Sequence, residues 1–280
     1  MKDKVCLVTG ATSGIGRATA AGLAKSGLGV VMLCRDRTRG ELVRDEITSQ
    51  TRNQSVDLMV ADLSSLASIR KFVTDFEAKY PRLDVLINDA AVYSGTRVVT
   101  SEGFELMFAT NYLGPFLLSR LLVPRLEAGR PSRIINVTAP SSTMPRLDDL
   151  QGERKFGALG AFGASKAEDL LFTYAFARKL EGREVTANAY HPGIVRTGLM
   201  RGAPAPVRFV SGIMNLAVGV SPERASEGVV ELATSDHFAK ATGQLFHKGK
   251  SISAPFIEDE DLQEKLWKTS CGLAGVPETV

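Results

Sequence analysis

Paired cysteines, long apolar runs and a strong net charge are all absent from this sequence. The three cysteines, Cys6, Cys34 and Cys271, form no CxxC pattern, so we expect neither disulfides nor a metal site. Unpaired thiols are typical of a reducing compartment, which predicts a cytoplasmic protein. The apolar segment 5–8 follows only four residues, so we also expect no signal peptide.

No segment approaches the roughly 20 consecutive apolar residues that a transmembrane helix needs, so no membrane span is expected. The net charge is only +3 and the basic residues are scattered, which argues against a nucleic-acid partner. The sequence also lacks repeats and linkers rich in proline, glycine or serine. These absences together predict one globular domain over residues 1–280.

What the sequence contains is a regular alternation of short, β-rich apolar runs with segments of helical periodicity. Strands apolar on both faces and separated by helices are typical of a parallel sheet covered on both sides. The sequence therefore predicts an α/β fold, a doubly wound domain whose seven-stranded parallel sheet has helices on both faces. The expected strands are 4–9, 29–34, 56–61, 83–88, 132–138, 185–191 and 243–247, and the expected helices are 14–26, 38–51, 64–79, 101–128, 161–182 and 222–236.

Two irregular segments, 139–160 and 198–221, interrupt this alternation. Both follow strands at the edge where a doubly wound sheet binds its ligands, and long loops in a compact domain are usually functional or disordered. The second segment is rich in apolar side chains between Leu199 and Met214. We predict that it is a lid over a small, mostly apolar substrate; the alternative is a surface helix packed on its own core.

Three glycines, Gly10, Gly14 and Gly16, lie between the first strand and the first helix. A turn without Cβ atoms lets the backbone approach a pyrophosphate, and the helix N-terminus faces the phosphates with a partial positive charge. The second strand ends at Cys34 and Arg35, where an acidic residue suits NAD and a cation suits the 2′-phosphate of NADP. Arg35 therefore predicts NADP(H); a solvated loop arginine is the alternative.

These glycines, together with the run Ala161-Phe162-Gly163-Ala164-Ser165-Lys166, closely resemble the short-chain dehydrogenase/reductase family. The resemblance covers nearly the whole chain and implies a Rossmann domain that binds a nicotinamide dinucleotide. Further segments look like the retinol-dehydrogenase-like branch of that family, namely Cys34-Arg35-Asp36, Asp62-Leu63-Ser64, Asn111-Tyr112-Leu113-Gly114, Asp149-Leu150-Gln151-Gly152 and Leu266-Trp267-Lys268-Thr269-Ser270-Cys271.

The resemblance also implies which residues contact the cofactor. Asp62 should meet the adenine amino group, and the segment 88–91 should lie along the ribose. That segment reads Asn-Asp-Ala-Ala where the family has Asn-Asn-Ala-Gly, which adds the carboxylate of Asp89 beside the cofactor. His191 is expected to be structural. The implied cofactor set is Gly10, Thr12, Ser13, Gly14, Ile15, Gly16, Arg35, Asp62, Leu63, Asn88, Ala90, Lys166, Pro192, Gly193, Ile194 and Thr197.

The family's chemistry uses four side chains. An Asn organises a water, a Ser polarises the substrate oxygen, a Tyr transfers the proton, and a Lys lowers the pKa of that Tyr and binds the nicotinamide ribose. Asn111 and Lys166 match their positions, but the Ser position falls on Ala139 and the Tyr position on Phe162. The two groups that would touch the substrate oxygen are therefore missing.

Other side chains offer partial replacements. Ser141 or Ser142 could supply the serine hydroxyl if the alignment slips by a few residues, whereas Thr138 should point to the opposite face of its strand. Tyr93 could reach a substrate from the opposite wall; the alternative is an ordinary packed aromatic.

Three functions are consistent with such a site. The first is an atypical NADPH-dependent reductase of imines, iminium ions or activated C=C bonds, whose reduction does not need the Tyr proton relay. The second is a non-redox enzyme such as a cyclase or isomerase, and the third is a sensor or scaffold that binds NADP(H). In the family the helix corresponding to 161–182 often forms a dimer interface, so we also expect a homodimer.

Overall fold

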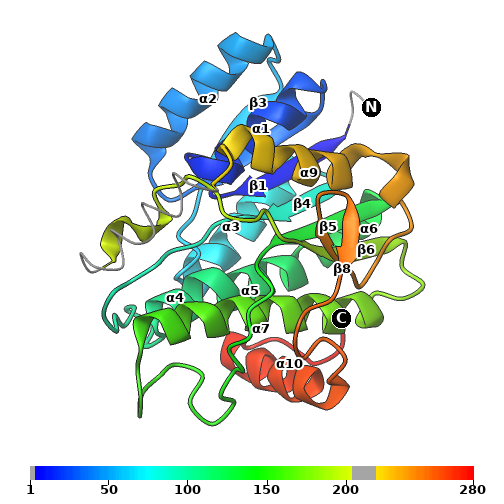
Figure 1. Cartoon of the computed structure of the whole chain (residues 1–280). Helices are drawn as coiled ribbons and strands as arrows, with labels where there is room; N and C mark the ends of the chain where they lie inside the picture. The colour runs from blue at the N-terminus through cyan, green and yellow to red at the C-terminus, as the bar shows by residue number, and fades with distance from the viewer. Residues whose placement is uncertain (1–3, 204–218) are drawn as a thin grey trace.

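The computed structural model describes residues 4–203 and 219–280, and its strands form one sheet (Figure 1). The strand order is β3-β2-β1-β4-β5-β6-β7-β8. All neighbours pair in parallel except β7 and β8, which pair antiparallel. The bounds are β1 Val5–Thr9, β2 Gly29–Cys34, β3 Val56–Val60, β4 Val85–Asn88, β5 Ser132–Val137, β6 Val185–Tyr190, β7 Leu245–His247 and β8 Lys250–Ile252.

The doubly wound fold is confirmed, but the predicted count of seven strands is wrong, because the sheet has eight. Lys248 and Gly249 both have positive φ, at 48° and 73°, and they connect β7 to β8. Two successive residues of positive φ form the tight turn that matches the twist of an antiparallel pair. The short strand β8 therefore folds back as a hairpin on the edge of an otherwise parallel sheet.

Helices cover both faces of the sheet (Figure 1). On one face lie α1 Gly14–Lys25, α2 Arg37–Thr51 and α9 Pro222–Thr234, and on the other lie α3 Leu66–Lys79, α5 Gly114–Leu121, α7 Ala158–Lys179 and α10 Glu260–Ala274. Side chains of β1 alternate between the two cores, with Cys6 and Val8 in one and Leu7 in the other. This alternation explains why the central strands are apolar on both faces.

The helix expected over 101–128 is divided into four pieces. After α4 Leu106–Phe108 the chain makes a π-helical turn at Ala109–Leu113, followed by α5 and by α6 Val123–Ala128. α4 begins where it does because the Glu105 carboxylate accepts a hydrogen bond of 2.7 Å from the Phe108 backbone N–H. Single π turns inside helices are frequent at functional sites, and this one carries Asn111.

Helix α10, which the sequence analysis did not predict, packs along α7 (Figure 1). The Trp267 ring centroid lies 5.7 Å from that of Phe176 and 6.2 Å from that of Phe172. The apolar side chains of α7 that suggested a dimer face are mostly buried within this one chain, including Leu170, Leu171, Phe172, Phe176 and Leu180. Their apolar character therefore has an explanation inside the monomer, and the homodimer stays a prediction.

Only part of the predicted lid can be described. The 3-10 turn Leu199–Gly202 lies within the described residues, whereas 204–218 lie outside them. Leu199 and Met200 pack with Phe162 and with the buried Tyr93. In the described ranges, no helix is both long and apolar enough to cross a membrane.

Candidate active site

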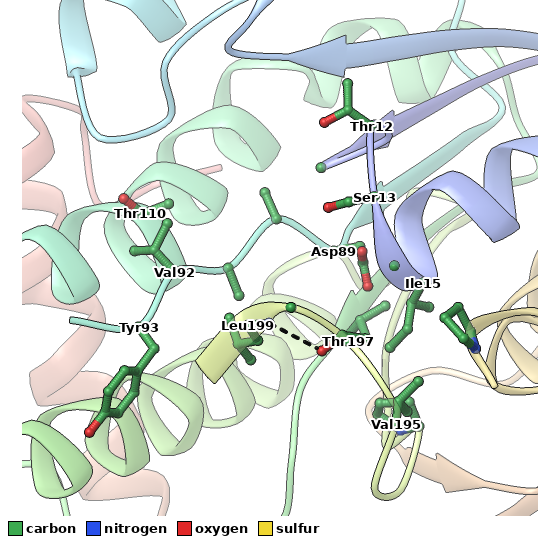
Figure 2. A pocket seen from close by; sticks show the side chains of 18 of the residues that line it. Thr12, Ser13, Ile15, Asp89, Val92, Tyr93, Thr110, Val195, Thr197 and Leu199 are labelled. Carbon is green, nitrogen blue, oxygen red and sulfur yellow. Dashed lines mark hydrogen bonds between the residues drawn. The ribbon is translucent and has the colours of Figure 1, made fainter. Parts of the chain in front are cut away.

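A cavity of about 800 Å³ lies at the carboxyl ends of the parallel strands, where loops from both halves of the sheet meet (Figure 2). Its size is in the range typical of cofactor and small-molecule sites. The loops after β1 to β6 and the first turns of α7 line it. Among the described residues no cluster of metal-ligating side chains occurs, there or elsewhere.

The turn between β1 and α1 forms one end of the cavity. Gly10 has φ +66°, and a Cβ atom there would lie 2.9 Å from the Cα of Ala90, so only glycine fits this position. Thr9 fastens the same junction, because its Oγ1 accepts hydrogen bonds from the N–H groups of Asp89 (2.9 Å) and Ala90 (3.0 Å). The backbones of the two loops therefore lie close together in front of the α1 N-terminus, the end of a helix that binds phosphate groups. The predicted Gly10, Thr12, Ser13, Gly14 and Ile15 line the cavity, and Gly16 does not.

Two exposed arginines, Arg35 and Arg39, line the cavity beyond the end of β2. Asp62 and Leu63, which the sequence analysis predicts to contact the cofactor, line it after β3. One oxygen of Asp62 accepts hydrogen bonds from the N–H and the hydroxyl of Ser64, which fixes the carboxylate in place. This end of the cavity therefore offers two cations to an anionic group.

The two side chains at the end of β4 point in different directions. Asn88 donates to Ser119 Oγ (2.9 Å) and Asn136 Oδ1 (2.8 Å) inside the core, so it does not line the cavity. Asp89 does line it, and Figure 2 shows its carboxyl group near Ile15 at the start of α1. Burial raises the pKa of Asp89 to about 7, although Lys166 and a hydrogen bond from the Gly16 backbone act to lower it.

The reacting end of the cavity contains no hydroxyl at the two substituted positions. Phe162 and Ala139 line it, next to Lys166, whose Nζ donates to the Val137 carbonyl oxygen at 3.3 Å. The Thr138 hydroxyl does not replace the missing serine, because it donates to the Lys166 carbonyl oxygen at 2.9 Å. Positions 139 and 162 therefore offer no hydroxyl proton, and Lys166 supplies a positive charge beside them.

Asn111 is buried behind the cavity rather than lining it. Its Oδ1 accepts from the Val92 N–H at 2.7 Å, and its Nδ2 donates to the Val92 carbonyl at 3.0 Å and to Ser165 Oγ at 3.1 Å. Asn111 thus fixes the loop after β4 to α7.

Apolar side chains surround the substrate end. The Tyr93 ring packs edge-on against Phe162 with centroids 5.8 Å apart, and Figure 2 shows Val92 and Leu199 between Tyr93 and the α1 turn. Ser141, which the sequence analysis considered as a substitute, lies against Gly163: its Oγ is 3.2 Å from where a Cβ of Gly163 would be. Neither Ser141 nor Ser142 lines the cavity.

The segment after β6 closes the remaining wall. Of the residues predicted to bind the cofactor in this segment, Pro192, Gly193 and Thr197 line the cavity, whereas Ile194 does not and is 39% exposed. The His191 ring lies tilted against that of His247, with centroids 5.0 Å apart, and burial together with this neighbour lowers the pKa of His191. Sequence reasoning did not name Thr110 and Pro222, which line the cavity because of their place at the sheet edge.

Comparison with known proteins agrees with this geometry. A profile of the family described as short chain dehydrogenase matches residues 4–206. Retinol dehydrogenase 13 of Homo sapiens is 38% identical over 282 residues, which cover 98% of this chain and 85% of that protein. Retinol dehydrogenase 14 of Homo sapiens is 36% identical over 294 residues, covering 99% and 88% respectively.

Solved structures give the same result. A protein of Mycobacterium paratuberculosis has a TM-score of 0.79 at 26% identity, covering 99% of this chain and 95% of that one. An actinorhodin polyketide ketoreductase solved with NADPH has a TM-score of 0.67 at 26% identity, covering 88% and 96%. With a family profile over most of its length and relatives more than 30% identical over nearly all of it, this chain belongs to the short chain dehydrogenase family.

Proposed function

We propose that this protein is an NADPH-dependent reductase whose substrate accepts hydride without needing a protein hydroxyl as proton donor. The observation that carries the proposal is the reacting end of the cavity, where Phe162 and Ala139 stand beside an intact Lys166. Hydride delivered to a ketone leaves an alkoxide that must be protonated in the site. A phenyl ring and a methyl group cannot donate that proton.

The residues present fit an NADP(H) molecule. The turn at Gly10 leaves no room for a Cβ atom, and the first residues of α1 line the cavity, as binding of a pyrophosphate at a helix N-terminus requires. Arg35 and Arg39 lie at the end of β2, where a 2′-phosphate would be bound. The relative with NADPH among the solved structures also supports this cofactor. Lys166 would bind the nicotinamide ribose, and the bound cofactor would supply the hydride.

Two substrate classes meet the chemical requirement. An iminium ion becomes neutral on accepting hydride and needs no acid. An activated C=C bond becomes an enolate, whose negative charge the Lys166 ammonium would stabilise and which water can protonate. The aromatic and aliphatic wall of Tyr93, Phe162 and Leu199 favours a small, mostly apolar molecule in either class.

The test is NADPH oxidation by the purified protein with a panel of imines, enones, ketones and aldehydes. We expect turnover with imines or enones and little with carbonyl compounds. The variant Lys166→Ala should weaken NADPH binding, because the ribose contact does not depend on a tyrosine. Strong ketone reduction by the wild type, unchanged in Tyr93→Phe, would overturn the proposed chemistry.

A non-redox function, as an isomerase, a cyclase or an NADP(H)-binding sensor, is the second candidate. The same two positions favour it, since a site that has lost both hydroxyls can keep its cofactor cavity without using hydride. Tight NADPH binding with no oxidation by any member of the panel would support this candidate. The homodimer and the cytoplasmic location stay predictions, and light scattering at micromolar concentration tests the first.

A further inference from the structure

A carboxylate occupies part of the anion site at the N-terminus of α1. A Cβ atom on Gly16 would lie 2.7 Å from Asp89 Oδ2, so the carboxyl group touches the first turn of the helix. Figure 2 shows Asp89 directed toward the α1 turn from the end of β4. The neighbouring backbone is held in place by Thr9, whose Oγ1 accepts hydrogen bonds from the N–H groups of Asp89 and Ala90.

The Asp89 carboxyl group at the α1 N-terminus affects how strongly a phosphate binds there. Helix N-termini stabilise a negative charge through unpaired N–H groups and the helix dipole. An ionised Asp89 already uses part of that stabilisation and repels a second anion in the same place. A protonated Asp89 removes the repulsion and can donate a hydrogen bond to a phosphate oxygen. A bound ligand would also displace water from the half-buried carboxyl group, which disfavours its ionised form further.

The other charged groups around the cavity do not remove the repulsion between an ionised Asp89 and a bound phosphate. Lys166 of α7 faces Asp89 and favours its ionised form. The pKa of His191, after β6, is lowered, so its ring is largely neutral at neutral pH and adds no positive charge beside Asp89. The remaining charged or ionisable groups that line the cavity are Cys34, Arg35, Arg39, Asp62, Tyr93 and Arg196. Within the described residues, Asp89 is the acidic side chain that lies against the first turn of α1.

We propose that Asp89 links the affinity for the cofactor to pH. The pyrophosphate of NADPH binds tightly only when the Asp89 carboxyl group is protonated. The inference rests on the proposed NADP(H) function. It predicts that one proton is taken up when NADPH binds in the pH range in which Asp89 is ionised in the free protein.

The experiment is calorimetric titration of the protein with NADPH from about pH 6 to 9, in pairs of buffers that differ in ionisation enthalpy. For the wild type, we expect Kd to rise by up to about tenfold per pH unit above the midpoint, together with net proton uptake. In Asp89→Asn, the affinity should stay nearly constant with pH and exceed that of the wild type at the alkaline end. Asp89→Ser, which also removes the carboxylate, provides a second variant if Asp89→Asn folds poorly by circular dichroism.

Two controls separate Asp89 from other titrating groups. The 2′-phosphate of NADPH titrates near pH 6 and contributes equally in wild type and Asp89→Asn, so it cancels in the comparison. Asp62→Asn removes another carboxylate from the same cavity and should keep the pH slope of the wild type, whatever its absolute affinity. Equal slopes and equal proton uptake in wild type and Asp89→Asn would overturn this inference and leave the cofactor assignment standing. Absence of NADPH binding by both proteins at every pH would overturn the two together.

Discussion

At the scale of single residues, the strongest prediction concerns Phe162 and Ala139. Both line the cavity beside Lys166, so hydroxyl groups added there would face the substrate. The double variant Ala139→Ser/Phe162→Tyr should raise kcat/KM for ketones by about 10²–10⁴-fold, the usual contribution of a general acid. Activity on imines or enones should stay the same or fall. Phe162→Leu is the matched control, since it changes the ring without adding a donor, and a gain in that variant would contradict the explanation.

Arg35 gives the second residue-scale prediction. Its side chain lines the cavity at the end of β2, and a hydrogen bond to a charged group contributes about 1.5–3 kcal/mol. Arg35→Ala should therefore weaken NADPH binding by about 10- to 150-fold and leave NADH binding nearly unchanged. Arg37, on α2, lies outside the cavity lining and forms a 3.9 Å ion pair with Glu41, so Arg37→Ala is the control. An equal loss for both dinucleotides in Arg35→Ala would contradict the role in 2′-phosphate recognition.

Sequence alone could identify the chemical type of each site position but not the direction of every side chain. The absence of hydroxyls at 139 and 162 follows from the residue types, whatever the packing. The direction of Asn88 does not, because its partners Ser119 and Asn136 come from α5 and β5. The approach of Asp89 to Gly16 likewise depends on how β4 and α1 pack across the sheet edge.

At the scale of elements, the predicted strands agree with β1 to β7 to within two residues at either end, because apolar runs bounded by polar residues define them well. The segment 101–128 keeps helical periodicity through its π turn, so the pattern could not reveal the break. Helix α10 was missed although its signals were present: Asp259 caps its start, and Gly275 ends it with φ +62°. Which face of α7 it covers is a tertiary property that no local pattern contains.

The packing of α10 on α7 makes a prediction about stability. Trp267 is 1% exposed and contacts Phe172 and Phe176. Trp267→Ala should lower the free energy of unfolding by about 3–5 kcal/mol, the usual cost of removing a large buried aromatic. Chemical denaturation followed by circular dichroism measures it. Lys268→Ala, on the exposed side of the same helix, should change stability very little, and an equally small loss in Trp267→Ala would show that α10 is not tightly packed.

At the scale of the whole molecule, buried carboxyl groups make stability depend on pH. Glu168 and Asp169 are almost fully buried in α7, and Glu168 has no hydrogen-bond partner for either oxygen within the described residues. Burial, together with nearby Glu105 and Asp169, raises the pKa of Glu168 well above its usual range, and burial raises that of Asp169 to about 7. Their folded-state pKa values exceed the unfolded ones, so the stability they contribute is complete at acid pH and is lost as pH rises through neutrality.

Glu168→Gln should therefore flatten the fall in unfolding free energy between about pH 5 and 8, with the larger gain at the alkaline end. Denaturation midpoints across that range provide the measurement. Glu258→Gln, at an exposed position, is the control and should follow the wild-type curve. A Glu168→Gln curve parallel to that of the wild type would mean that folding does not change the protonation of Glu168 over this range, which would contradict a raised pKa.

Helix α7 is one uninterrupted rod of 22 residues. Phe162 and Lys166 stand at its cavity end, whereas Phe176 lies 14 positions after Phe162, about 21 Å along the axis at 1.5 Å per residue. A rigid helix held at its far end transmits any tilt there to its near end. Packing of Trp267 on Phe172 and Phe176 therefore fixes the orientation of α7. Removing the Trp267 ring should displace Phe162 and Lys166, although no residue of the cavity is changed.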